Sequence, residues 1–165
     1  MAKIIEHPEE PVVTLLRTHG LTIATAESCT GGLVAATLIN ISGVSEVLKE
    51  SYITYSDETK EKILHVSQTT LDTYTAVSEQ TAREMVQGVT RIAESDVGIS
   101  VTGIAGPEGG SKDFPVGLVY IGLKVSDTVR VLRFQFSGDR MAVRTQAVTK
   151  ALEELLALLK EEGYQ

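Results

Sequence analysis

The sequence predicts an α/β fold: a three-layer α/β/α sandwich around a mixed, mainly parallel sheet with a C-terminal hairpin. Helix-type and strand-type hydrophobic patterns alternate over residues 9–102, which is typical of a sheet covered by helices on both faces. Two adjacent strand patterns, 116–125 and 129–136, then flank a Ser-Asp-Thr turn and precede one long helical pattern. The length of 165 residues fits one compact domain, which we expect to cover residues 1–165.

The first half of the chain begins with a predicted helix that opens at Pro8 and ends at Gly20, since proline suits a helix start and glycine a helix end. β-Branched residues then indicate a strand. The elements expected in the rest of this half are a strand at 21–26, a helix at 33–39, a short helix at 44–50 and a strand at 51–55.

In the second half, serine residues mark the starts of three predicted helices, because a serine side chain can accept a hydrogen bond from a free backbone N–H of the first turn. These residues are Ser56, Ser67 and Ser78. A buried strand is expected at 96–102, followed by a glycine-rich loop at 103–115. The last helix is expected to be capped by Asp139 or Ser137, to reach about Lys160, and to bury Val143, Ala147, Ala151, Leu155 and Leu158.

The composition excludes several kinds of function. The formal net charge of -7 disfavours nonspecific nucleic-acid binding, which requires Lys and Arg to neutralise phosphates, although helix amides and a single Arg could still hold one phosphorylated small ligand. With Cys29 as the only cysteine, neither an intrachain disulfide nor a cysteine-based zinc site can form. The histidines His7, His19 and His65 lack the spacing of metal ligands. We expect no metal and no cofactor, and a carboxylate-bound ion stays open.

The sequence also predicts where the protein acts. No hydrophobic run approaches the roughly 20 residues of a membrane span, and residues 1–8 lack the apolar core of a signal peptide. A chain with one cysteine and no such segments is typical of the reducing cytoplasm. We therefore expect a cytoplasmic protein with no membrane partner.

The first segment that could carry chemistry is 26–32, where a predicted strand ends and a helix follows. Ligands of open α/β sheets gather beyond the carboxyl ends of strands, and the free N–H groups of a following helix suit an anion or an oxyanion. Gly31 and Gly32 would let a ligand approach the backbone closely. The alternative is an ordinary helix cap in which glycine only permits the turn.

The second segment joins a strand end to a helix. Tyr55 lies where a strand is expected to stop, and Lys60 lies about one turn into the next helix. A lysine acts as a base only where burial or nearby positive charge lowers its pKa. The alternative is a solvated surface lysine. Lys62 is the competing lysine and is expected to point to solvent.

The third and fourth segments are the loop 103–115 and the start of the last helix. The loop has the small residues of a ligand cradle but neither a P-loop nor a dinucleotide fingerprint, and the alternative is a flexible surface loop. Arg140 lies in the first turn of a helix, where the helix dipole disfavours a cation. We therefore expect an anion beside Arg140, either a ligand or a carboxylate such as Asp139 or Glu27. The alternative is a surface arginine.

Together these segments resemble the CinA C-terminal domain family, which includes stand-alone nicotinamide-nucleotide amidases. The resemblance extends from about Leu15 to about Leu158, with its motifs in the same order. The motifs are Thr25–Gly32, Thr54–Ser56 with Lys60, Ser100–Pro107 with Gly109–Gly110, Pro115–Gly117 and Phe136–Arg140. In many bacteria this domain follows a larger pyrophosphatase-like domain. Such a domain is absent from this sequence, so the stand-alone form is expected.

The resemblance implies hydrolysis of nicotinamide mononucleotide to nicotinate mononucleotide and ammonia, an α/β/α fold, no required cofactor and a homo-oligomer. It places the nucleophile on Ser28, the base on Lys60 and an assisting tyrosine on Tyr55. The residues expected to bind the small-molecule nucleotide are Thr30, Gly31, Gly32, Thr102, Gly103, Ala105, Gly106 and Arg140.

Two positions depart from the family pattern. Asp57 stands where relatives often have Asn, and its carboxylate could raise the pKa of Lys60 and weaken this lysine as a base. Phe114 stands where a lysine usually precedes Pro-Val-Gly, with Lys112 nearby. If that lysine contacts substrate, affinity or specificity would differ here.

Three alternatives stay open for the function. Cys29 could be the nucleophile, since thiols are intrinsically stronger nucleophiles, although no histidine motif is placed to partner it. The fold could bind a nucleotide for regulation without turnover. A Ser–Lys pair could also hydrolyse another small amide. In an amidase, backbone N–H groups at 30–32 or 103–106 would hold the oxyanion.

Overall fold

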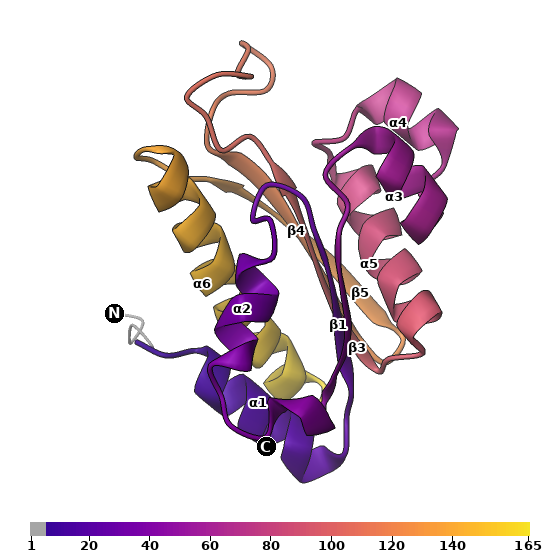
Figure 1. The fold of residues 1–165 in the computed structure, drawn as a ribbon, viewed down its shortest axis with the longest axis vertical. Helices are drawn as coiled ribbons and strands as arrows, with labels where there is room; N and C mark the ends of the chain where they lie inside the picture. Colours follow the sequence, from indigo (N-terminus) through magenta and orange to yellow (C-terminus); the bar gives the residue numbers. More distant parts are fainter. Residues whose placement is uncertain (1–5) are drawn as a thin grey trace.

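The computed structural model describes residues 6–165, which form a five-stranded sheet between two layers of helices (Figure 1). The strands are β1 (Ile23–Glu27), β2 (Leu48–Ile53), β3 (Val97–Gly103), β4 (Leu118–Val125) and β5 (Thr128–Gln135). The helices are α1 (Glu9–His19), α2 (Leu33–Ile39), α3 (Asp57–Leu64), α4 (Gln68–Tyr74), α5 (Glu79–Ala93) and α6 (Arg140–Glu161), with a 3-10 turn η1 (Val44–Glu46). The predicted α/β/α class is confirmed. Residues 1–5, which hold most of the segment inspected for a signal peptide, lie outside the described residues.

The sheet is mixed, with the spatial order β2-β1-β3-β4-β5. Strand β1 pairs in parallel with β2 and β3, whereas β4 pairs antiparallel with β3 and β5, so β4 alone of the five runs against the others. The predicted hairpin joins β4 to β5, with Val125 paired to Thr128 across the turn. Within this turn Ser126 has a φ of 51°, a left-handed conformation that suits a tight hairpin.

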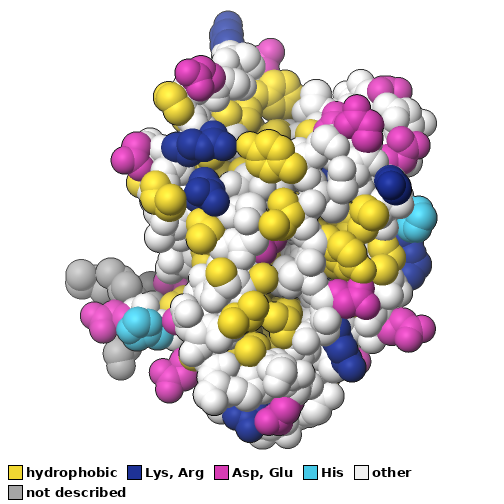
Figure 2. Space-filling model, viewed as in Figure 1, with side chains coloured by type: hydrophobic (Ala, Val, Ile, Leu, Met, Phe, Trp, Pro, Cys, Tyr) yellow, Lys and Arg dark blue, Asp and Glu magenta, His cyan; other side chains and the backbone are white. Residues whose placement is uncertain are grey.

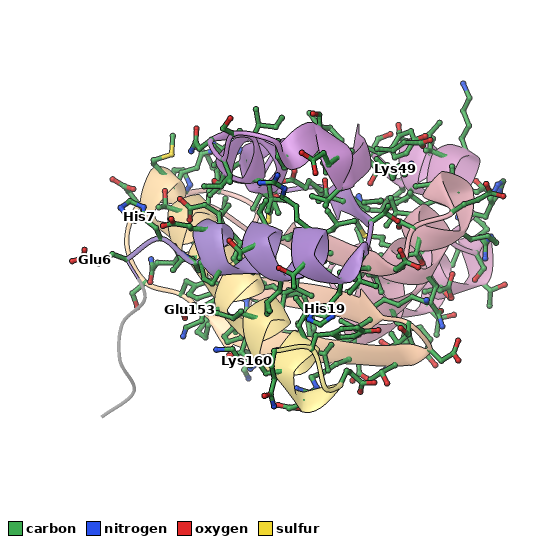
Figure 3. All side chains as sticks on the ribbon, turned by 90° about the horizontal axis from the view of Figure 1, so that it is seen from below. Glu6, His7, His19, Lys49, Glu153 and Lys160 are labelled. Carbon is green, nitrogen blue, oxygen red and sulfur yellow. The ribbon has the colours of Figure 1, made fainter. Side chains whose placement is uncertain are left out.

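Helices α1, α2 and α6 cover one face of the sheet, and α3, α4 and α5 cover the other (Figure 1). The side chains predicted to face the core from α6 are all buried against the sheet, as the helical spacing requires. Seen from below, α1 lies beside α6, and His19 at its end contacts the Tyr164 ring edge-on (Figure 3). Within residues 6–165, every helix is too short or too polar to cross a membrane.

Local signals locate most helix starts correctly. The hydroxyls of Ser56, Ser67 and Ser78 each accept a hydrogen bond from the backbone N–H three residues later, which satisfies one free donor of the first turn. At the start of α6 the cap is Asp139 rather than Ser137. The predictions of helix position succeed here because a cap and its partner are close in the sequence.

The prediction of a helix at 44–50 is wrong. Only the 3-10 turn η1 forms in this stretch, and β2 already begins at Leu48. Strand β2 lies at the edge of the sheet with mostly exposed side chains, so it lacks the hydrophobic pattern of a buried strand. Its pairing with β1 defines it instead, because strand formation depends strongly on tertiary context.

The chain connections create a crevice at the carboxyl ends of β1 and β3. From β1 the chain passes through α2 to β2 on one side, and it then returns through α3, α4 and α5 to β3 on the other side. Because α2 lies on one face of the sheet and α3, α4 and α5 lie on the other, the loops that leave β1 and β2 diverge (Figure 1). Ligands of open α/β sheets bind at such a switch point.

Candidate active site

Strand register brings the ends of β1 and β2 to the same level, two residues before the end of β3. Glu27, the last residue of β1, pairs with Ile53 of β2 and with Val101 of β3. The pairing continues one step further, because Ser28 N–H donates to the Val101 carbonyl and Thr54 N–H donates to the Glu27 carbonyl. Ser28 therefore lies between the loops that follow β2 and β3.

A pocket of about 260 Å³ lies at this edge of the sheet, between these loops and the start of α6. Figure 2 shows basic side chains over the start of α6, close to hydrophobic side chains on the same face. The pocket brings together all three predicted catalytic residues and five predicted binding residues. These are Ser28, Tyr55, Lys60, Thr102, Gly103, Ala105, Gly106 and Arg140.

The other three predicted binding residues, Thr30, Gly31 and Gly32, do not line this pocket. Thr30 is fully buried. A Cβ atom on Gly31 would lie 3.4 Å from Nη2 of Arg144, and one on Gly32 would lie 3.3 Å from Cδ1 of Ile53. The two glycines therefore leave room for protein side chains rather than for a ligand in the pocket.

Lys60 is buried on α3, with 1% of its surface exposed, which is rare for a lysine. Its Nζ lies 3.3 Å from Oγ of Ser28, within hydrogen-bond distance. The same amine donates to the carbonyls of Thr54 at 2.9 Å and Tyr55 at 3.4 Å. Among the ion pairs within residues 6–165, none involves Lys60. The amine thus has hydrogen-bond partners but no counter-ion.

Burial lowers the pKa of Lys60 below its ordinary value, because the charged ammonium loses its water. The negative charge of Asp57 raises this pKa, in the direction that the sequence predicts, and Cys29 does so to a smaller extent. Burial outweighs both. Lys60 is therefore suited to take a proton from Ser28, whereas Lys62 on the same helix is exposed.

The neighbouring thiol has the opposite character. Burial raises the pKa of Cys29 to about 12, and the nearby negative charge of Glu27 acts in the same direction. Only the thiolate is a good nucleophile, and almost none is present at neutral pH with such a pKa. The geometry and the pKa together favour Ser28 over Cys29 as nucleophile.

Tyr55 and Arg140 meet at the rim of the pocket. Arg140 donates from Nη2 to the Tyr55 hydroxyl at 3.2 Å and from Nη1 to the Gly106 carbonyl at 2.8 Å. The Tyr55 side chain is 63% exposed, and its contact with Lys60 is made by the backbone carbonyl. The tyrosine ring is therefore placed to meet a ligand at the entrance rather than to relay a proton between Ser28 and Lys60.

Of the two alternatives expected for the anion beside Arg140, the carboxylate of Asp139 or Glu27 is excluded, because both cap helices instead, and a ligand anion stays a prediction. Glu27 is 1% exposed and accepts hydrogen bonds from Val34 N–H at 2.8 Å and Ala35 N–H at 3.1 Å, at the start of α2. Asp139 caps α6 in the same way. The amino-terminal amides of α2 are thus already occupied by a protein carboxylate, and a ligand anion cannot use them.

Backbone donors for an oxyanion remain at other points of the pocket lining. The N–H groups of Cys29, Ala105 and Gly106 make no hydrogen bond to another residue within residues 6–165, and that of Cys29 contacts only its own thiol. In the segment 30–32, Gly31 N–H donates to the Ser28 carbonyl, and Thr30 N–H makes no hydrogen bond among the described residues but does not line the pocket. Free N–H groups beside a nucleophile are what stabilises a tetrahedral oxyanion.

Comparison with known proteins identifies the family of this fold and site. Residues 5–159 match the sequence profile of the CinA C-terminal domain. The chain belongs to the CinA C-terminal domain family. It is 53% identical over 148 residues to a CinA-like protein of Kosmotoga olearia, and 53% identical over 142 residues to a CinA-like protein of Fusobacterium nucleatum. These matches cover 90% and 86% of this chain but 36% and 34% of the relatives, so the chain spans about a third of their length.

Solved structures of the CinA superfamily match over nearly their whole length. A CinA superfamily protein from Klebsiella pneumoniae gives a TM-score of 0.90 with 36% identity, covering 93% of this chain and 96% of that chain. The competence/damage inducible protein CihA from Agrobacterium tumefaciens gives a TM-score of 0.89 with 39% identity, covering 96% and 99%. The mixed five-stranded architecture is therefore that of the CinA superfamily.

The CinA C-terminal domain pocket also contains residues that sequence reasoning missed. Ala76 and Val77, just before α5, form part of its wall, and Glu108 lies on its rim. The Thr102 hydroxyl donates to the Ala76 carbonyl at 2.7 Å, which connects the end of β3 to this part of the wall. No motif marks residues 76–77, and only the packing of α5 against the sheet places them here. Within residues 6–165, no cluster of His, Cys, Asp and Glu has the composition of a metal site.

Proposed function

We propose that this protein is an amidohydrolase that converts nicotinamide mononucleotide to nicotinate mononucleotide and ammonia, with Ser28 as nucleophile and Lys60 as base. The observation that supports it most directly is the buried Lys60 amine, 3.3 Å from the Ser28 hydroxyl. Burying an amine without a counter-ion costs stability, and perturbed groups of this kind cluster at functional sites. The substrate follows from the resemblance of the motifs to those of nicotinamide-nucleotide amidases.

The first half of the reaction forms an acyl-enzyme. Neutral Lys60 takes the proton of Ser28 Oγ as this oxygen attacks the carboxamide carbon. The N–H groups of Cys29, Ala105 and Gly106 are the candidates to stabilise the oxyanion. Protonated Lys60 then gives its proton to the amide nitrogen, the C–N bond breaks and ammonia leaves. The nicotinoyl ester on Ser28 remains, which splits one difficult hydrolysis into two easier steps.

The second half regenerates the enzyme. Neutral Lys60 takes a proton from a water molecule, whose oxygen attacks the ester carbon. The tetrahedral intermediate collapses, the ester bond breaks and the proton on Lys60 returns to Ser28 Oγ. Free nicotinate mononucleotide leaves. The lowering of the Lys60 pKa by burial favours both halves, because the amine must be neutral at the start of each one.

The pocket has features that suit a mononucleotide. Its volume of about 260 Å³ is close to the lower end of the roughly 300–1,000 Å³ that is usual for small-molecule sites, which disfavours a long peptide. We assign the phosphate to Arg140 on the rim, where its guanidinium could exchange the Tyr55 hydroxyl for a charged acceptor. The exposed Tyr55 ring offers a flat surface for the ribose or pyridine ring.

The experiment that tests this function is incubation of the purified protein with nicotinamide mononucleotide. Ammonia and nicotinate mononucleotide should form in equal amounts, and Ser28→Ala should form neither. Nicotinamide, nicotinamide riboside and glutamine serve as competing amides. Since the first two keep the carboxamide but lack the phosphate, we expect both to react more slowly than the nucleotide.

Other outcomes would favour the alternative functions. Binding of the nucleotide without ammonia release, by folded wild-type protein, would contradict the amidase and favour a regulatory nucleotide-binding module. Faster hydrolysis of another amide would keep the Ser28–Lys60 chemistry and replace the substrate.

A further inference from the structure

We propose that Arg144 is a positioning residue for the Ser28 nucleophile, a role that rests on the proposed Ser28–Lys60 chemistry. From the first turns of α6, its Nε donates to the Cys29 carbonyl at 3.0 Å and its Nη2 donates to the Thr30 carbonyl at 3.0 Å. These are the carbonyls of the two residues that follow Ser28. A planar guanidinium that makes two such hydrogen bonds fixes both position and direction, which a single-point contact does not.

Backbone hydrogen bonds support the turn after Ser28 at the Ser28 and Thr30 carbonyls but not at the Cys29 carbonyl between them. Within residues 6–165, the Cys29 carbonyl accepts no hydrogen bond except the one from Arg144. The Thr30 carbonyl accepts a second one, from Leu33 N–H. Cys29 is 7% exposed, so water has little access to this residue. Loss of the guanidinium would leave a polar group in a buried turn without its partner, and the turn would rearrange to recover one.

Arg144 also determines the direction of a free backbone donor. The peptide bond between Cys29 and Thr30 is trans, so its N–H points away from the carbonyl that Arg144 holds. This Thr30 N–H makes no hydrogen bond among the described residues. A cation on the carbonyl side strengthens the N–H as a donor, because hydrogen bonds in a chain polarise one another. Gly31 leaves the space that the guanidinium needs.

The position of Arg144 on α6 links the nucleophile to the pocket rim. Arg140 and Arg144 are four residues apart and therefore lie on the same side of the helix. Arg140 reaches the rim, and Arg144 reaches the turn after Ser28. On the other side of this turn, the Glu27 carboxylate at the end of β1 accepts hydrogen bonds from backbone N–H groups at the start of α2. Ser28 is thus held between two helices through one anion and one cation.

The test measures the reactivity of Ser28 directly. A fluorophosphonate probe labels a nucleophilic serine whatever the natural substrate is, so its second-order labelling rate reports the reactivity of Ser28 alone. This rate is compared with kcat and KM for ammonia release from nicotinamide mononucleotide. The variants are Arg144→Met and Arg144→Lys. The matched control is Arg83→Met, which removes an arginine from the surface of α5, where its partner is Glu79.

We expect Arg144→Met to lower both the labelling rate and kcat by roughly 10-fold or more, since misplacement of a reacting group by about 1 Å can cost 100-fold. KM should change little, because Arg144 does not line the pocket. The labelling rate and kcat of Arg144→Lys should lie between those of Arg144→Met and the wild type. An ammonium can donate to one carbonyl but cannot hold both in the same geometry. The pH midpoint of labelling should not move, because Arg144 is not among the groups that shift the pKa of Lys60.

Three outcomes would overturn the proposal. The first is a labelling rate and a kcat in Arg144→Met equal to those of the wild type. The second is an equal fall of both quantities in Arg83→Met. The third is failure of the probe to label Ser28 in the wild type. If Arg144→Met does not fold, Arg144→Lys decides the question by its labelling rate at an unchanged Tm. Labelling of the wild type without ammonia release would refute the proposed substrate, while the labelling comparison would still decide the role of Arg144.

Discussion

Nζ of Lys60 lies 3.3 Å from Oγ of Ser28, although the two residues are 32 positions apart in the sequence. They meet because β1 and β2 pair in parallel, which brings the loop after β2 beside the residue after β1. Helix α3 begins in that loop, and its packing against α5 buries the lysine. The distance between the two side chains is therefore a result of sheet register and helix packing together.

The first prediction concerns the Ser28–Lys60 pair. Ser28→Ala and Lys60→Ala should each lower kcat for ammonia release by at least roughly 1,000-fold, because nucleophile and base act as one unit. For the same reason, the double variant should be no worse than either single variant. Single-turnover assays would measure this, with nucleotide binding by calorimetry as the control for an intact pocket. Losses that multiply in the double variant would show that the two residues act independently.

The second prediction concerns the pH dependence. Asp57 raises the pKa of Lys60, so Asp57→Asn should lower that pKa further. Activity requires the neutral amine and falls when Lys60 becomes protonated, so the acid limb of the pH profile of kcat/KM should move to lower pH. Glu58→Gln is the matched control, since Glu58 is the adjacent carboxylate and is not among the groups that shift Lys60. An acid limb that stays in place or moves to higher pH would contradict the assignment of Lys60 as base.

The third prediction concerns Cys29. Its raised pKa of about 12 leaves almost no thiolate at neutral pH, so Cys29→Ala should keep activity within roughly threefold of the wild type. Iodoacetamide at neutral pH should alkylate the native protein only slowly. The protein unfolded in denaturant provides the control, because its thiol has regained an ordinary pKa. Activity that survives Ser28→Ala but disappears in Cys29→Ala would reverse the assignment of the nucleophile.

The fourth prediction concerns the contact between α3 and α5. A Cβ atom on Gly88 of α5 would lie 2.1 Å from the Leu64 carbonyl oxygen at the end of α3, far inside van der Waals contact. Gly88→Ala should therefore destabilise the protein by about 1–3 kcal/mol through overpacking. A fall in Tm of several degrees would be seen by calorimetry, whereas Gln87→Ala at the exposed neighbouring position should leave Tm nearly unchanged. An unchanged Tm in Gly88→Ala would show that α3 can move away from α5 without cost.

Much of the fold could be predicted from the sequence where the signal is local. The caps at Ser56, Ser67 and Ser78 were predictable because the hydroxyl and its N–H partner are three residues apart. The stripe on α6 was predictable because its period matches a helix. Strand β2 was misplaced, since its identity depends on hydrogen bonds to β1 and not on its own side chains.

The candidate site was predictable to a smaller extent. Motif resemblance pointed to the residues that line the pocket, but it also included Thr30, Gly31 and Gly32, which lie against protein side chains. For Arg140 it suggested the substrate or a carboxylate, and in the structure this arginine donates to a carbonyl and a hydroxyl. The contact between Arg144 and the turn after Ser28 has no signal in the sequence, because it joins residues more than 100 positions apart.

The sequence by itself determined the α/β class, most helix starts and the residue types that the proposed amide hydrolysis would need. The tertiary structure alone decided that Glu27 caps α2, that burial raises the pKa of Cys29 and that burial lowers the pKa of Lys60. Residue type and spacing act over a few positions, and they can be read along the chain. The pKa of a group depends on how much water and charge surrounds it, and those surroundings are assembled from distant segments only when the chain folds.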